Sequence, residues 1–140
     1  MPPPVSRILE TALYVTDLGR AEAFYARLFG FTRLVRDARM CALAIPNREV
    51  LLLFHRGASA QPSKTPFGFI PGHDASGHQH LCFSIAIHDL EAWRRHLSEA
   101  GIPVEREMHW PRGGISLYFR DPDGHSLEVA TPGLWAHDRL

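Results

Sequence analysis

Two segments of this chain carry the same succession of features, and this internal repeat restricts the fold more than any other property of the sequence. Asp17 and Asp89 each stand directly before a segment with helical spacing of apolar residues, and the two segments end at Gly30 and Gly101. The two aspartates are 72 residues apart and the two glycines 71 residues apart. A duplicated unit of strand, helix and further strands is the simplest explanation.

The first copy begins with a strand pattern and continues through a helix to three more strands. Apolar and other residues alternate over 9–16, which places Leu9, Leu13 and Val15 on one face and Glu10, Ala12 and Tyr14 on the other. The helix is predicted after Asp17. Short apolar runs bounded by turn residues predict the later strands at about 31–36, 40–45 and 49–55.

The second copy has the same order. Residues 80–87 alternate between apolar residues and small or polar residues, which predicts a strand with one buried face. Asp89 is predicted to cap the second helix, and strands are predicted at about 103–109, 114–120 and 125–131. The predicted fold class is therefore α+β, with two βαβββ modules whose half-sheets curve around a shared cavity.

The length of 140 residues fits a single domain. We expect module 1 at about 5–56, a linker at about 57–78, module 2 at about 79–132 and a tail at 133–140. The linker is rich in Gly, Pro and Ser, and so long a loop inside a compact domain is often functional, so it is a candidate lid.

Composition limits the classes of partner. Lys plus Arg and Asp plus Glu number 15 each, so no basic field favours nucleic acid or an anionic membrane. Neither an apolar run of membrane-spanning length nor a signal-peptide pattern occurs, and the two cysteines form no paired-thiol motif. We expect a cytoplasmic protein with a small-molecule partner.

Three polar side chains fall on the strand faces that the helices do not cover: Glu10 in the first strand, His80 in the fifth and Glu128 in the eighth. Two carboxylates and an imidazole that point into one cavity need a cation among them. Oxygen and imidazole donors suit Mn, Zn, Ni, Co or Fe(II), and three protein ligands leave positions open for substrate. The sequence therefore predicts a catalytic divalent-metal site.

The paired modules, together with ETALYVTDLGRAEAFYARLFGF, GHQHLCFSI and YFRDPDGHSLEV, resemble the vicinal oxygen chelate superfamily. This superfamily includes glyoxalase I, fosfomycin-modifying thiol transferases, extradiol dioxygenases, methylmalonyl-CoA epimerases and bleomycin-binding proteins. The resemblance implies a metal on the concave face that is held by Glu10, His80 and Glu128. Glutamate departs from the His or Gln that is usual at the first position. The resemblance also implies a homodimer, in which the ligands can come from two chains.

Further matches imply different reactions within the superfamily. Leu52 stands where glyoxalase I carries a fourth ligand, which disfavours that enzyme. The segment from His109 to Glu128 resembles the signature of the extradiol dioxygenases, with His109 as acid/base and Tyr118 as a substrate hydrogen-bond partner, although a single imidazole suits their iron chemistry poorly. The thiol transferases share the three-ligand layout, and the resemblance gives Arg112 and Arg120 as anion-binding residues.

The sequence thus favours a metal-dependent enzyme that acts by Lewis-acid chelation on a small oxygenated or electrophilic substrate, of lyase, isomerase or thiol-transferase type. Tyr118 and His109 are the candidate catalytic residues. The candidate substrate-binding residues are Arg120, Ser116, Arg112 and Trp110. The alternatives are an extradiol dioxygenase and a metal-free binding protein, for which Trp110, Phe67, Phe69 and Trp135 could line the cavity.

Overall fold

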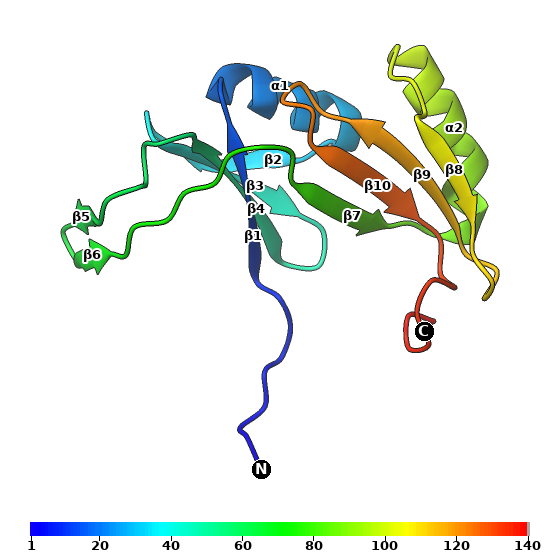
Figure 1. Cartoon of the computed structure of the whole chain (residues 1–140), viewed down its shortest axis with the longest axis horizontal. Coiled ribbons are helices and arrows are strands. Elements are labelled where there is room, and N and C mark those ends of the chain that lie inside the picture. The colour runs from blue at the N-terminus through cyan, green and yellow to red at the C-terminus, as the bar shows by residue number, and fades with distance from the viewer. Residues whose placement is uncertain (140) are drawn as a thin grey trace. The chain divides into compact units, whose positions relative to one another are not determined.

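The computed structural model describes residues 1–139 and divides into two compact units, Met1–Ser76 and Gly77–Leu140. Each unit has a four-stranded sheet with one α-helix, so the predicted α+β class and the repeat of βαβββ order are confirmed (Figure 1). The strand order is β1-β4-β3-β2 in the first unit and β7-β10-β9-β8 in the second. In both sheets the first strand of the unit pairs in parallel with the last.

The first unit follows the predicted boundaries closely. Its elements are β1 (Glu10–Val15), α1 (Leu18–Phe29), β2 (Thr32–Arg36), β3 (Met40–Ile45) and β4 (Glu49–His55). As predicted, the Asp17 side chain accepts a hydrogen bond from the backbone N–H of Arg20, and Gly30 ends α1 with a φ of 73°. Leu9, predicted to lie in the first strand, is exposed just before it.

The core of the first unit lies between α1 and one face of its sheet. Strand residues of this face are almost fully buried, as are the facing residues of α1: Leu13, Val15, Cys41, Leu43, Leu51, Leu53, Ala21 and Tyr25. Each buried leucine contributes about 1.5–3 kcal/mol relative to an exposed one. The helix therefore fixes which strand residues, among them Glu10, Ala12 and Tyr14, are left on the opposite face.

The linker contains regular structure that the sequence pattern did not predict. A two-stranded hairpin forms from β5 (Ser63–Thr65) and β6 (Gly68–Ile70), and Figure 1 shows it projecting from the rest of its unit. Its strands have three residues each, too few for alternation to be recognised. The segment after the hairpin returns to the sheet, where the His73 N–H donates to the Ser59 carbonyl at 2.8 Å.

The second unit comprises β7 (His80–Ser84), a 3-10 turn η1 (Ile87–Asp89), α2 (Leu90–Glu99), β8 (Arg106–His109), β9 (Ile115–Arg120) and β10 (Ser126–Ala130). The prediction that Asp89 caps α2 through its side chain is wrong. Because η1 leads directly into α2, Asp89 has near-helical backbone angles, φ −95° and ψ −4°, and makes no side-chain cap bond. Gly101 follows the helix with a φ of 71°, as its predicted stop role requires.

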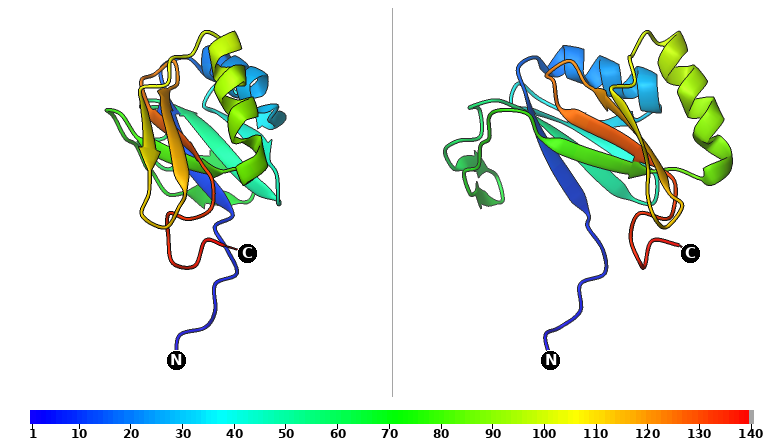
Figure 2. Two further views of the ribbon diagram at one scale, coloured as in Figure 1. Left: turned by 90° about the vertical axis from the view of Figure 1, so that its right-hand side faces the viewer. Right: turned by 45° about the vertical axis from the view of Figure 1, so that its right-hand side comes forward.

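The second sheet also has one apolar and one polar face. Leu117, Phe119, Leu127 and Val129 are fully buried, and α2 lies along this sheet (Figure 2). The alternate residues of β9 and β10 form the other face and include Ser116, Tyr118, Ser126 and Glu128. Within residues 1–139, no helix has the length and apolar character needed to cross a lipid bilayer.

Candidate functional site

Glu128 lies in the middle of β10, between β7 and β9. It is directly opposite Cys82 on β7 and Tyr118 on β9, and it is only 4% exposed. A carboxylate at this depth needs hydrogen-bond donors or a cation. The structure supplies donors from the same sheet face.

Ser116 and Trp110 hold one oxygen of this carboxylate. The Trp110 Nε1–H donates to Ser116 Oγ at 2.8 Å, and the fully buried Ser116 hydroxyl donates to Glu128 Oε2 in a short contact. This chain of donors satisfies Oε2 and fixes the orientation of the carboxyl plane, so that Oε1 faces elsewhere.

His80 presents its second ring nitrogen to that remaining oxygen. His80 Nε2 lies 3.4 Å from Glu128 Oε1, while Nδ1 lies 2.8 Å from the carbonyl oxygen of Ser126. Because a carbonyl only accepts, Nδ1 carries the proton, and in the neutral imidazole Nε2 has its lone pair free. A nitrogen lone pair and a carboxylate oxygen thus face each other across a gap suited to a cation.

Tyr118 and Cys82 flank the carboxylate, and both remain protonated at neutral pH. Burial first, and then the negative charge of Glu128, raise the pKa of Tyr118 above its usual value. The same two causes raise the pKa of the Cys82 thiol to about 12. Hydrogen bonding to Glu128 adds to both shifts, so the Tyr118 hydroxyl is a hydrogen-bond donor with Glu128 among its partners. With its proton held, Cys82 is a poor nucleophile and a poor metal ligand as it stands.

The equivalent positions of the first unit can be read from the strand register. Leu52 lies between Ala12 on β1 and Ala42 on β3, as Glu128 lies between Cys82 and Tyr118. Two residues earlier, Glu10 pairs with Val50 as His80 pairs with Ser126. Glu10 and His80 are therefore the same position of the repeat.

The other predicted site residues have different surroundings. His109 shares a face of β8 with Glu107, to which its Nε2 is bonded at 2.8 Å, and Glu107 also binds Arg94 of α2. The register of β8 with β9 places His109 on the opposite sheet face from Tyr118 and Ser116. The structure thus does not bring His109 to Glu128.

The two predicted anion-binding arginines are also apart from the carboxylate. Arg120 shares the face of Tyr118 but forms a two-pronged ion pair with Glu105, through Nε at 2.9 Å and Nη2 at 3.2 Å. Arg112 is exposed in the turn between β8 and β9, where its carbonyl accepts a hydrogen bond from Arg139. Of the predicted set, the second unit therefore gathers His80, Glu128, Ser116, Tyr118 and Trp110.

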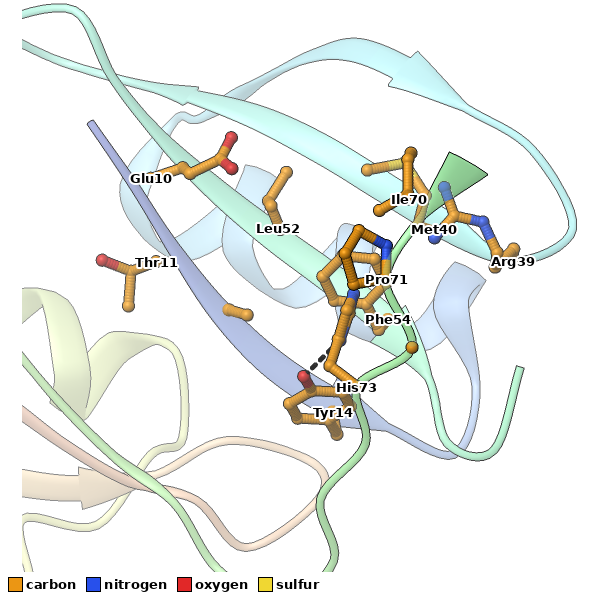
Figure 3. A pocket seen from close by; sticks show the side chains of 12 residues that line it. Glu10, Thr11, Tyr14, Arg39, Met40, Leu52, Phe54, Ile70, Pro71 and His73 are labelled. Carbon is orange, nitrogen blue, oxygen red and sulfur yellow. Dashed lines mark hydrogen bonds between the residues drawn. The ribbon is translucent and has the colours of Figure 1, made fainter. Parts of the chain in front are cut away.

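A pocket of about 580 Å³ lies in the first unit, on the sheet face away from α1 (Figure 3). Its floor is a small apolar cluster that includes Ala12, Met40, Leu52 and Phe54. The returning linker supplies a wall at 70–73. Sequence reasoning assigned Glu10 to a site but missed the rest of this pocket, because alternation identifies the floor only as a sheet face.

Two polar residues of the pocket also escaped prediction. His73 accepts or donates a hydrogen bond with the Tyr14 hydroxyl at 2.6 Å, and Arg39 lies with its guanidinium carbon 5.5 Å from the centre of the Phe54 ring. Both stand outside regular strands, where no periodic pattern indicates the direction of a side chain.

Within each unit, over residues 1–139, no three His, Cys, Asp or Glu side chains gather closely enough to hold a metal ion. In the second unit, His80 and Glu128 form a close pair of potential metal ligands. Glu10 lies at the start of β1 in the first unit and is exposed.

Comparison with known proteins agrees with the duplicated fold. Metallothiol transferase FosB of Shouchella clausii is 45% identical over 132 residues, which make up 93% of this chain and 83% of that protein. Glutathione transferase FosA of Serratia marcescens is 28% identical over 124 residues, 89% of this chain and 79% of that protein. The crystal structure of lactoylglutathione lyase from Agrobacterium tumefaciens is similar with a TM-score of 0.87 and 37% identity, covering 96% of this chain and 99% of that one.

A sequence model of one superfamily matches residues 7–129, a range that spans both sheets up to Val129 and includes Glu10, His80 and Glu128. The chain therefore belongs to the Glyoxalase/Bleomycin resistance protein/Dioxygenase superfamily.

Proposed function

We propose that this protein is a divalent-metal-dependent transferase that joins a small thiol to an oxygen-bearing electrophile. The observation that carries the proposal is the facing pair of His80 Nε2 and Glu128 Oε1, with the other atom of each group already held by Ser126 and Ser116. The 45% identity to a metallothiol transferase supports the choice of reaction.

The donor pair fits a metal ion. Two ligands at about 2.1 Å from a metal and at a tetrahedral angle are separated by about 3.4 Å, and the two facing atoms are 3.4 Å apart. The bond from Nδ1 to the Ser126 carbonyl is the kind of outer contact that orients metal-binding histidines. His80 and Glu128 would be the ligands from the second unit. Glu10 is the proposed third ligand, because it occupies the position of the repeat that His80 occupies.

A bound divalent ion would supply Lewis-acid polarisation of a substrate oxygen. Tyr118 keeps its proton at neutral pH, so its hydroxyl can donate a hydrogen bond to an oxygen that gains negative charge. With a pKa of about 12, Cys82 does not serve as the nucleophile, so the thiol has to come from a second substrate. In the transfer, a carbon–sulfur bond forms as a carbon–oxygen bond breaks, and the released oxygen takes up the proton lost by the thiol.

The test is an assay of the purified full chain with Mn(II) or Zn(II). The substrates are cysteine with 1,2-epoxybutane, the hemithioacetal of methylglyoxal and glutathione, and catechol. We expect loss of free thiol with the epoxide, reduced at least about hundredfold in His80→Ala and Glu128→Gln. The exposed His88 and Glu99 of the same unit give the matched controls His88→Ala and Glu99→Gln, which keep the activity.

Other outcomes of this assay would contradict the proposal. Isomerisation of the hemithioacetal without reaction of the epoxide would indicate a lyase, and oxygen uptake with catechol would indicate a dioxygenase.

A metal-free binding protein is a second candidate function, and the pocket of the first unit favours it. Its volume of about 580 Å³ lies in the range of small-molecule sites, and its floor is apolar. Such a protein would bind a ligand there whether or not a metal is present.

A further inference from the structure

The pocket of the first unit has opposite charges at its two ends. Figure 3 shows Glu10 at one end and Arg39 at the other, with Leu52 between them. Both residues line the pocket, whereas the floor between them is formed by the side chains of Ala12, Met40, Leu52 and Phe54. A ligand that fills the pocket therefore packs its apolar middle on the floor, and Glu10 and Arg39 determine which charged groups fit at its two ends.

Arg39 has unused hydrogen-bonding capacity. One of its guanidinium nitrogens, Nη1, donates to the buried Ser59 hydroxyl at 2.9 Å, and the group lies beside the Phe54 ring. Over residues 1–139 it forms no ion pair with a carboxylate, unlike Arg33, Arg94 and Arg120. Because a guanidinium carries five N–H donors, several remain for an anionic group. Partial burial strengthens such a contact relative to one in open solvent.

The rim beside Arg39 is preorganised. The Tyr14 hydroxyl is bonded to His73 Nδ1 at 2.6 Å, and the His73 ring packs edge-on against Phe54 with centroids 4.5 Å apart. The backbone next to His73 is tightly placed, because a Cβ atom on Gly72 would lie 2.4 Å from the Ala60 carbonyl oxygen. The linker therefore forms a fixed wall of aromatic and apolar groups, against which a flat apolar ligand can pack.

We infer that this pocket binds small monoanions with an aromatic or branched apolar body, whose carboxylate or comparable anionic group pairs with Arg39. The anion is directed to that end because the Glu10 carboxylate repels it from the other. The inference rests on the proposed function in one respect only. If Glu10 binds the metal, the end of the substrate remote from Arg39 is the end that reacts.

The experiment measures binding of three probes of equal shape to the chelator-treated full chain by calorimetry: 4-phenylbutyrate, 4-phenylbutan-1-ol and 4-phenylbutylamine. We expect the carboxylate to bind about tenfold more tightly than the alcohol. The amine is expected to bind in the reverse orientation, with its ammonium near Glu10, so Arg39→Gln should not weaken it. Arg39→Gln should remove the preference for the carboxylate and change the affinity for the alcohol by less than about twofold, whereas Arg39→Lys should retain part of the preference. Arg95→Gln, at an exposed arginine of α2 in the other unit, is the control and leaves the preference intact.

A second set of variants tests whether the probes occupy the pocket. Leu52→Trp should fill the space over the floor and weaken both the acid and the alcohol by at least about tenfold. Ala12→Leu gives the same test if Leu52→Trp does not fold, as judged by thermal unfolding. Three results would overturn the inference. They are equal affinities for acid and alcohol in the unaltered protein, a preference for the acid that survives Arg39→Gln, and binding that neither filling variant weakens.

Because these measurements are made without metal, the inference and the proposed function can be refuted independently. Loss of Mn(II) binding with the preference intact would overturn only the proposed function. Metal binding and thiol transfer without the preference would overturn only the inference.

Discussion

At the scale of single residues, the arrangement around Glu128 depends on where each proton is held. The Ser126 carbonyl requires a proton on His80 Nδ1, and the Ser116 hydroxyl donates its proton to Glu128 Oε2. In each of the two candidate ligands, one atom is thus held by a hydrogen bond, His80 Nδ1 or Glu128 Oε2. The other atom, His80 Nε2 or Glu128 Oε1, faces the other ligand. In the proposed site both of the facing atoms are acceptors, an arrangement that a bound cation would stabilise.

Ser116 is proposed as a positioning residue for the metal ligand, and its removal is a direct test. In Ser116→Ala, Glu128 Oε2 loses its donor while the Trp110 N–H loses its acceptor. We expect a loss of about 1–3 kcal/mol in the free energy of unfolding without metal, and about a tenfold loss of Mn(II) affinity. Chemical denaturation and metal titration measure the two quantities.

Ser116→Thr, which keeps the hydroxyl, should recover most of the Mn(II) affinity. Ser98→Ala, on α2, is the matched control. If Ser116→Ala bound Mn(II) as tightly as the unaltered chain, Ser116 would have no positioning role.

At the scale of elements, the sequence predicted strands and helices well where the segment was long enough for its alternation or helical spacing to be recognised. The bounds of β3 and β4 agree with the predicted 40–45 and 49–55. Residues 121–124, with the sequence DPDG, form the turn between β9 and β10. Asp121 Oδ1 accepts from the backbone N–H groups of Asp123 and His125, and Gly124 has a φ of 80°, which together fix the register of β10 against β9.

Element ends were less predictable, because a cap depends on backbone angles that the residue type does not determine. Asp17 and Asp89 have the same neighbour, Leu, and the same place in the repeat, yet only Asp17 has an extended backbone and a capping bond. The 3-10 turn η1 causes the difference.

This difference predicts unequal effects of two equivalent substitutions. Asp17→Ala should lower the free energy of unfolding by about 1 kcal/mol, whereas Asp89→Ala should lower it by less than about 0.5 kcal/mol. Urea denaturation of both variants measures the effects. Equal losses would show that the capping bond of Asp17 contributes nothing to stability.

At the scale of the whole molecule, the duplication and the faces of the strands were accessible from sequence, since both follow from period and spacing. The repeat placed Glu10, His80 and Glu128 on the faces that α1 and α2 leave uncovered, and the strand register agrees. His109 was assigned by resemblance to a signature, and the register of β8 placed it on the other face. Arg39 and His73 could not be predicted, because loop conformation depends on contacts distant in the sequence, such as those of Ser59 and Tyr14.

The two copies of the repeat have diverged in chemistry while keeping their backbone register. The position that holds the buried carboxylate Glu128 in the second unit holds Leu52 in the first, where it belongs to the apolar floor of the pocket. One unit thus offers a polar pair suited to a cation, and the other offers an apolar surface suited to the body of a small substrate.

Metal binding by His80 and Glu128 is tested directly by the metal content of the purified chain after loading with Mn(II) and removal of excess ion, measured by mass spectrometry. We expect about one ion per chain. It should be lost in His80→Ala and in Glu128→Gln, bind at least about tenfold more weakly in Glu10→Gln, and be retained in His88→Ala and Glu99→Gln. No bound ion with Mn(II), Zn(II), Ni(II), Co(II) or Fe(II), or an ion retained by both His80→Ala and Glu128→Gln, would contradict metal binding by this pair.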